Sequence, residues 1–128
     1  MIKIQQNGVK WEGGYTPCFY STDSLDSCVI IYARDYEHLP AELGNVQNDT
    51  DSREDYFEGD RVKLYPGDKF YSEALAAYKK RRVADSKRWL KHSEKQLEKE
   101  LSGYAHPGTV EYLRRNIENY KKIIAAGA

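Results

Sequence analysis

The sequence predicts an α+β fold, with an N-terminal antiparallel β-sheet of four to five strands followed by a C-terminal antiparallel helical hairpin. In residues 1–68, short apolar runs alternate with polar residues and are separated by Gly, Pro, Asn and Asp, which is typical of strands joined by turns. In residues 69–128, apolar residues recur every three or four positions, which is typical of helices. A chain of 128 residues has the length of one domain. We therefore expect a single domain, 1–128, with a sheet part and a helical part.

Residues 2–11 predict a β-hairpin. Apolar residues lie on both sides of Asn7-Gly8, the dipeptide that best accepts the positive φ angles of a type I′ turn. A two-residue loop at this point fixes the register and places Ile4 opposite Trp11.

Residues 15–20 and 28–34 predict the next two strands. The second of these begins CVIIYA, which is apolar on both faces and therefore typical of a central strand. If the connecting hairpin is centred on Asp23, Cys18 faces Cys28. Because the chain has only two cysteines and no CxxC pair, we expect reduced core thiols rather than a redox pair.

Residues 35–60 predict a long acidic loop with at most a short helical turn, because Pro and Gly interrupt this segment and no apolar period persists. Long loops in compact domains are commonly functional. Val62 and Leu64 then alternate with basic residues, so residues 60–65 predict the last strand.

Residues 69–102 predict one long helix, because they contain neither Gly nor Pro and are rich in helix formers; Asp68 is the expected N-cap. Ser86 and Ser93 are small enough for another helix to approach closely. A second helix begins at Pro107. Its apolar residues follow the spacing of a coiled-coil seam: Val110, Leu113, Ile117, Tyr120 and Ile124.

The two predicted helices differ in length, at about 50 Å and about 26 Å. The second helix therefore covers only residues 84–102 of the first. The earlier half must be covered by the sheet or by another chain, so the long helix also offers a face for a homodimer.

The net charge of zero is the sum of two opposite halves. Residues 1–68 hold 6 Lys/Arg and 13 Asp/Glu, whereas residues 69–128 hold 14 and 7. The acidic excess is greatest in residues 42–60, and the basic excess is greatest in residues 79–88. Such segments steer charged partners. The alternative is that the two ends neutralise each other, within one chain or between copies.

The sequence contains no catalytic or cofactor fingerprint. Asp49-Thr-Asp51 begins like a calcium loop, but Arg53 and Glu54 occupy the positions where an EF-hand needs an oxygen ligand and Gly. The three histidines share no metal-ligand spacing with the cysteines, and GxSxG and HExxH are absent. No segment has the pattern of a membrane span or a secretion signal. We expect a cytoplasmic protein that is not an enzyme and uses no metal or cofactor.

Three segments carry a resemblance: Tyr32-Ala-Arg-Asp-Tyr36, Leu39-Pro-Ala-Glu-Leu43 and Asp55-Tyr-Phe-Glu-Gly-Asp60. They resemble small accessory proteins carried by phages and conjugative elements of gut Firmicutes. The resemblance implies a mobile-element origin, where small non-enzymatic proteins often oppose host immunity. The chain is similar to the anti-CRISPR class in its size, in its lack of motifs and in an acidic surface that imitates DNA phosphates.

The first functional hypothesis is therefore an interaction protein that inhibits a nucleic-acid-binding complex of host defence through an acidic, DNA-mimicking surface. Charge complementarity would speed capture, and an aromatic pair in the acidic loop would anchor the partner. The expected partner-binding residues are Asp49, Asp51, Glu54, Asp55, Tyr56, Phe57, Glu58 and Asp60.

Two alternatives use the basic segment instead. One is an oligomeric nucleotide-binding sponge that sequesters defence signalling molecules, and the other is a small accessory protein that binds DNA directly. Both use cationic groups for phosphates and aromatic rings for bases. The expected residues are Tyr78, Arg81, Arg82, Lys87, Arg88 and Trp89.

Overall fold

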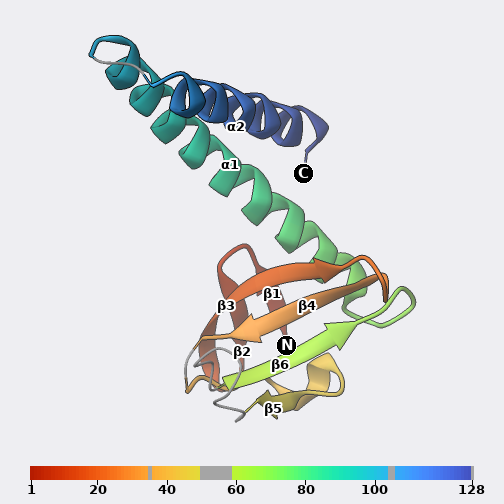
Figure 1. The fold of residues 1–128 in the computed structure, drawn as a ribbon. Coiled ribbons are helices and arrows are strands. Elements are labelled where there is room, and N and C mark those ends of the chain that lie inside the picture. The colour runs from red at the N-terminus through yellow and green to blue at the C-terminus, as the bar shows by residue number, and fades with distance from the viewer. Residues whose placement is uncertain (35, 50–58, 104–105, 128) are drawn as a thin grey trace. The chain divides into compact units, whose positions relative to one another are not determined.

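A computed structural model describes residues 1–34, 36–49, 59–103 and 106–127 and confirms the α+β class (Figure 1). Within these ranges, six strands form one antiparallel sheet in the order β1-β2-β3-β4-β6-β5, followed by a long and a shorter helix. The elements are β1 (Lys3–Gln5), β2 (Gly8–Trp11), β3 (Gly14–Asp23), β4 (Cys28–Ala33), the 3-10 helix η1 (Ala41–Leu43), β5 (Gln47–Asp49), β6 (Gly59–Leu64), α1 (Tyr71–Leu101) and α2 (Pro107–Ala126).

The chain forms two compact units, Met1–Tyr78 and Lys79–Ala128. The first unit extends beyond residue 68, where the predicted sheet part ends, through about the first two turns of α1. The reason is that Phe70, Ala74 and Ala77 are buried in the core of the first unit. The sheet therefore covers the start of the long helix. This is one of the two alternatives predicted from the different helix lengths; the other was a second chain.

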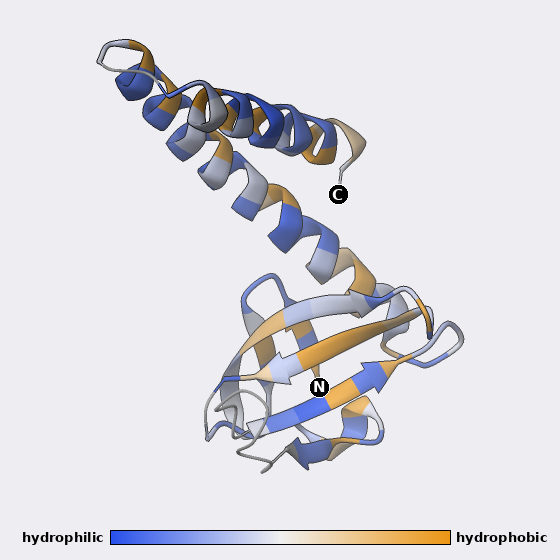
Figure 2. Ribbon diagram, in the orientation of Figure 1, coloured by the Kyte–Doolittle hydropathy of each residue, from blue (hydrophilic) through white to orange (hydrophobic). Residues whose placement is uncertain are grey.

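The core of the first unit lies on one face of the sheet. Strand β4 runs between β3 and β6 and is apolar along most of its length, as Figure 2 shows, which confirms it as a central strand. Inward-facing side chains alternate along the strands with outward-facing ones, as the pleat requires. The most deeply buried side chains are less than 2% exposed: Val9, Cys18, Val29, Ile31, Val62 and Leu64.

The first hairpin has a different register from the one predicted. Ile4 pairs with Val9 rather than with Trp11, and Gly8 lies in β2 instead of in the turn. Gly8 does not have the positive φ of a type I′ turn. Its role is steric, because a Cβ there would lie 2.4 Å from the carbonyl oxygen of Thr16. The glycine thus lets β2 lie against β3.

The β3–β4 hairpin turns later than predicted. Oδ1 of Asp23 accepts hydrogen bonds from the backbone N–H groups of Leu25 and Asp26, at 2.9 Å and 3.4 Å, so Asp23 starts the turn instead of standing at its centre. Asp23 consequently pairs with Cys28, and Cys18 pairs with Ala33. The two thiols do not face each other across the hairpin, and both cysteines are buried and free.

The predicted acidic loop contains more structure than a helical turn. The prediction allowed at most a short helical turn, which fits the 3-10 helix Ala41–Leu43, but it did not include β5 at Gln47–Asp49, which pairs with β6 at the sheet edge. The predicted last strand is confirmed as β6. Residues 50–58 of this loop lie outside the described residues.

Both predicted helices are present. Helix α1 starts at Tyr71, and Oδ2 of Asp68 accepts a hydrogen bond from the N–H of Tyr65, so this carboxylate stabilises the turn before the helix. Helix α2 has Pro107 at its start, and Nδ1 of His106 accepts a hydrogen bond from the N–H of Gly108.

Helix α2 runs back along the later part of α1 within the second unit (Figure 1). Leu97 of α1 and Ile117 of α2 line the same hollow, and Ser86 and Ser93 are buried. The rest of the seam of α2 is only half-buried.

Candidate functional site

Most of the predicted acidic site lies outside the described residues. This applies to Asp51, Glu54, Asp55, Tyr56, Phe57 and Glu58. Asp49 is the last residue of β5, and Asp60 is the second residue of β6.

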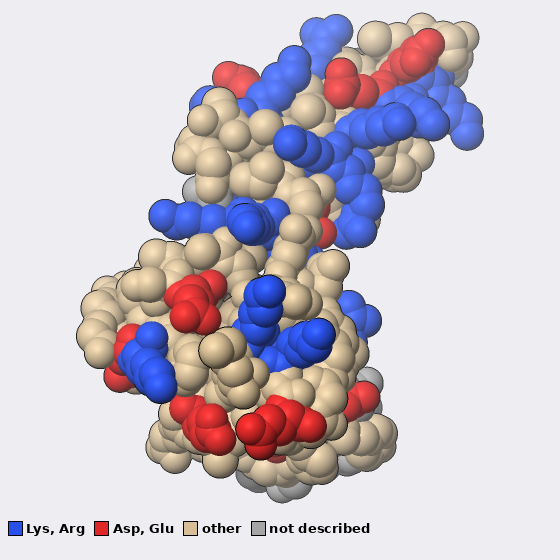
Figure 3. Space-filling model, turned by 180° about the vertical axis from the view of Figure 1, so that it is seen from behind, with Lys and Arg blue, Asp and Glu red and all other residues tan. Residues whose placement is uncertain are grey.

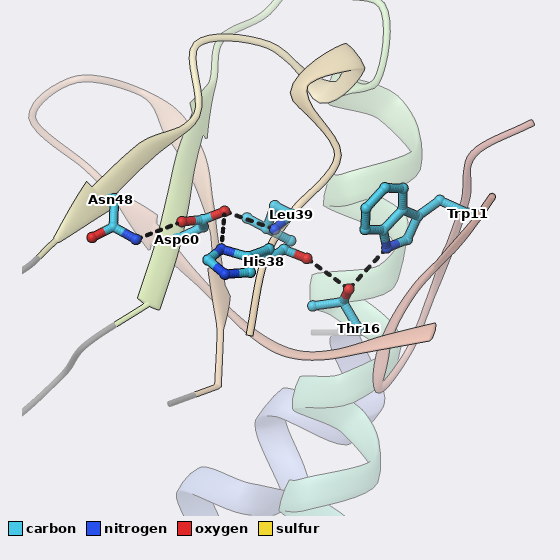
Figure 4. Close-up of polar contacts among 6 residues, drawn as sticks. All are labelled: Trp11, Thr16, His38, Leu39, Asn48 and Asp60. Atoms are coloured by element: carbon cyan, nitrogen blue, oxygen red, sulfur yellow. Dashed lines mark hydrogen bonds and ion pairs between the residues drawn. The ribbon is translucent and has the colours of Figure 1, made fainter. Parts of the chain in front are cut away.

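Asp60 has a structural role (Figure 4). The residue is only 7% exposed. Its Oδ2 accepts a hydrogen bond from the N–H of Leu39, and its Oδ1 accepts one from Nδ2 of Asn48, both at 2.9 Å. Nδ1 of His38 lies 3.5 Å from Oδ2. The carboxylate thus ties the loop before η1 to β5 and β6, and it does not belong to an exposed acidic surface, contrary to our expectation.

A second polar chain fixes the same loop to the first strands (Figure 4). Nε1 of Trp11 donates a 2.8 Å hydrogen bond to Oγ1 of Thr16, and this hydroxyl donates a 2.8 Å bond to the carbonyl oxygen of His38. Thr16 is buried, so its hydroxyl needs both partners. These groups hold the fold in place.

The predicted basic site lies on α1, where the second unit begins. Lys and Arg gather over the helices of this unit on the face that Figure 3 draws. At about 100° per residue, Lys80, Lys87 and Lys91 follow one side of the helix, and all three are exposed.

Asp85 neutralises part of this basic segment. Nε of Arg81 lies 3.2 Å from Oδ2 of Asp85, and Nη2 of Arg88 lies 3.0 Å from Oδ1. One carboxylate therefore pairs with two guanidinium groups along α1. Arg81, Asp85 and Arg88 together retain one positive charge. The exposed lysines supply most of the other positive charge in residues 79–91.

The two predicted aromatic residues of the basic site differ in their surroundings. Trp89 is 48% exposed, and the guanidinium carbon of Arg88 lies 5.8 Å from its ring centroid. The ring of His92 meets that of Trp89 edge-on at 5.9 Å. Tyr78, by contrast, packs against the core of the first unit, so Trp89 is the aromatic residue that this surface offers.

The structure also brings together residues that sequence reasoning did not select. Phe19, Tyr32 and Arg61 come from three strands and lie side by side on the sheet face opposite the core. Lys63 and Tyr65 follow on and after β6. The alternation of Arg61 and Lys63 with Val62 and Leu64 was visible in the sequence, but the strand pairing that joins them to the two aromatic rings was not.

The buried cysteines are poor nucleophiles. Burial raises the pKa of the Cys18 thiol from its ordinary value of 9.0 to about 12, and Sγ lies 3.2 Å from the carbonyl oxygen of Thr16. Burial also raises the pKa of Cys28. Since the thiolate is the reactive form, neither group is set up for catalysis.

Within the described ranges, no group of three or more His, Cys, Asp and Glu side chains is placed to hold a metal ion. None of the helices in this part of the chain is long and apolar enough to cross a membrane. Comparison with known proteins finds no matching family model, curated protein or solved structure.

Proposed function

We propose that the chain is a non-enzymatic protein that binds the phosphate backbone of nucleic acid through exposed lysines of α1. The observation that carries the proposal is the charge of residues 79–91, which contain seven Lys/Arg and one Asp. Because Asp85 pairs with Arg81 and Arg88, exposed lysines supply most of the net positive charge that phosphates would meet on this segment. Lysine contacts of this kind release counterions and give strongly salt-dependent binding.

The test measures binding of the full chain to a labelled DNA duplex by fluorescence anisotropy over a range of salt concentrations. The triple variant Lys80→Gln, Lys87→Gln and Lys91→Gln removes three phosphate contacts. We expect the slope of log K against log salt to become shallower by about 2.7, with an affinity loss of tenfold or more at low salt.

A matched control changes the net charge by the same amount elsewhere in the second unit. Arg115→Gln, Lys121→Gln and Lys122→Gln alter exposed residues of α2. This variant should keep most of the affinity. Equal losses in both variants would mean that net charge alone drives binding, and absence of binding to the unaltered chain would refute the proposal.

The acidic loop supports a second candidate function, inhibition of a nucleic-acid-binding defence complex by imitation of DNA phosphates. Its support is the charge of residues 42–60, seven acidic residues against one arginine. Asp60 no longer counts toward this surface, because its carboxylate is buried and hydrogen-bonded.

Neutralising the loop tests this candidate. The test uses the quadruple variant Asp49→Asn, Asp51→Asn, Glu54→Gln and Asp55→Asn. We expect it to keep its fold and to lose inhibition of the host complex that the unaltered chain binds. A pull-down from the native host identifies the complex first. Unaltered inhibition by the variant would reject the acidic surface.

A homodimer remains part of the proposal. Helix α2 has a coiled-coil spacing that is half-buried within one chain, and Leu101 and Tyr112 are exposed. A second copy that packs on these helices would double the number of phosphate contacts. Sedimentation equilibrium distinguishes the monomer from the dimer directly.

A further inference from the structure

The outer face of the sheet carries a row of side chains that crosses four strands. Phe19 of β3 pairs with Tyr32 of β4, Tyr32 pairs with Arg61 of β6, and Arg61 pairs with Gln47 of β5. Residues directly opposite each other in a sheet point to the same face. The neighbouring residues Cys18 and Val62 are buried in the core, so this row faces away from it.

Two aromatic rings begin this row and are stacked on each other. The ring centroids of Phe19 and Tyr32 lie 5.0 Å apart, with only 10° between the ring planes. Phe19 is 38% exposed although it is apolar and lies in the middle of a strand. Phe19 is exposed and Tyr32 is half-buried, and this pair on the outer side of the sheet adds nothing to the core but offers aromatic surface to a ligand.

Cationic and amide groups continue the surface beside the rings. Arg61 and Lys63 alternate along the outer side of β6, and with Asn45, Gln47 and Tyr65 they line a hollow of ≈280 Å³. Nζ of Lys63 lies 3.9 Å from a carboxylate oxygen of Asp26, and both side chains are well exposed. Such an exposed pair is weak and exchanges readily for another anion.

This combination of groups matches one class of ligand. Flat rings bind unstacked bases, cations bind phosphates, and amides hydrogen-bond base edges; sheets that bind single strands use the same chemistry. A duplex cannot use the rings, because its bases are already stacked within the helix. Arg61 and Lys63 place two cations on this face, beside Asp26, in a unit that holds 7 Lys/Arg and 14 Asp/Glu.

We infer that the outer face of the sheet is a binding site for single-stranded nucleic acid, with bases on Phe19 and Tyr32 and phosphates at Arg61 and Lys63. The inference rests on the proposed function in taking nucleic acid as the ligand, but it concerns a different surface in the other unit. The basic helix holds any phosphate backbone, whereas the sheet face selects unpaired bases.

The test measures the affinity of the full chain for a labelled oligothymidylate of about 12 nucleotides and for a duplex of the same length. Phe19→Leu keeps an apolar side chain and removes the ring. We expect it to weaken oligothymidylate binding about tenfold and to leave duplex binding unchanged. Phe19→Tyr keeps the ring and should keep the affinity.

Two further variants make the result independent of the stability of Phe19→Leu. Lys63→Gln changes an exposed residue and should make the salt dependence of oligothymidylate binding shallower by about 0.7. Tyr36→Leu removes an exposed ring from the loop after β4 and should leave binding to both nucleic acids unaltered. Circular dichroism confirms that each variant is folded.

The outcomes separate this inference from the proposed function. If Phe19→Leu and Lys63→Gln bind oligothymidylate like the unaltered chain, the sheet site is refuted, and duplex binding through α1 still stands. A second outcome supports the sheet site and refutes the helix proposal. In it, the unaltered chain binds oligothymidylate, the Phe19→Leu variant does not, and the α1 triple variant keeps its duplex affinity. If neither nucleic acid binds, both are refuted.

Discussion

The two units of this chain stabilise themselves in different ways. In the first unit, side chains from β2, β3, β4 and β6 close a core in which several residues are less than 2% exposed. In the described part of the second unit, only Ser86, Ser93 and Ile117 are buried, and the remaining seam is half-buried. The first unit holds 7 Lys/Arg and 14 Asp/Glu, and the second holds 13 and 6.

The comparison teaches that burial and charge distinguish residues with structural roles from those of the proposed binding surfaces. A sheet unit with its own core can carry a ligand site on its outer face, because the core lies on the other face. The two helices of the second unit bury few residues. The charged residues on their surface can therefore serve the proposed binding function. The stability of each unit should therefore respond differently to mutation.

The largest expected effect comes from the core of the sheet. Ile31→Ala removes a fully buried side chain from the central strand and should cost about 2–5 kcal/mol of unfolding free energy. Ile117→Ala in α2 should cost less, about 1–2 kcal/mol, because fewer groups surround it.

Urea unfolding measures both changes, since each unit contains one tryptophan. Trp89→Phe leaves Trp11 to report on the first unit, and Trp11→Phe leaves Trp89 to report on the second. Equal losses at both positions, with a single shared midpoint, would show that the units unfold as one and would break the comparison.

The next effect distinguishes the structural acid from the surface acids. Asp60→Ala leaves the buried N–H of Leu39 without its acceptor and should cost about 1–3 kcal/mol. Glu42→Ala, at an exposed position in η1, should change stability by less than about 0.5 kcal/mol. Thermal unfolding compares the two variants, and an equally small effect of Asp60→Ala would contradict the structural role of this carboxylate.

The smallest effect is a loss of stability at alkaline pH that comes from the core of the first unit. The thiol of Cys18 keeps its proton up to a pKa of about 12 when folded, but loses it near 9.0 when unfolded. The unfolded chain then binds fewer protons, so stability is fully present below pH 9.0 and falls as the pH rises toward 12. We expect Cys18 to contribute a loss of about 1 kcal/mol between about pH 9 and pH 10.

The control for this pH dependence is Cys18→Ala, which removes the titrating group. Urea unfolding at each pH gives the free energy of unfolding for both proteins, and their difference isolates the contribution of Cys18 from that of the rest of the chain. A difference that stays constant over this range would contradict the burial of the thiol.

The sequence predicted the elements well where one signal dominates. The continuous apolar run gave β4, and the absence of Gly and Pro gave α1. The register of the first hairpin was wrong, because the Asn7-Gly8 signal is local whereas Gly8 serves the contact with Thr16. Strand β5 was missed because its three residues are polar and their strand conformation depends on pairing with β6.

The candidate sites follow the same division. The basic segment of α1 was predictable, because helical spacing is known from the sequence alone and the charges lie close together in it. The row of Phe19, Tyr32 and Arg61 was not predictable, since it requires the pairing of β4 with β6 across the whole acidic loop. The burial of Asp60 was missed for the same reason, because Leu39 lies 21 residues away.

The burial of both native thiols makes this molecule convenient to label at an introduced cysteine. Cys18 and Cys28 are its only cysteines, and both are buried with raised pKa values, so maleimides should react with them slowly. A cysteine introduced by Lys63→Cys on the sheet or by Lys87→Cys on α1 should therefore take up a fluorophore selectively. The emission of that dye would report which surface an oligonucleotide reaches, without removal of either native cysteine.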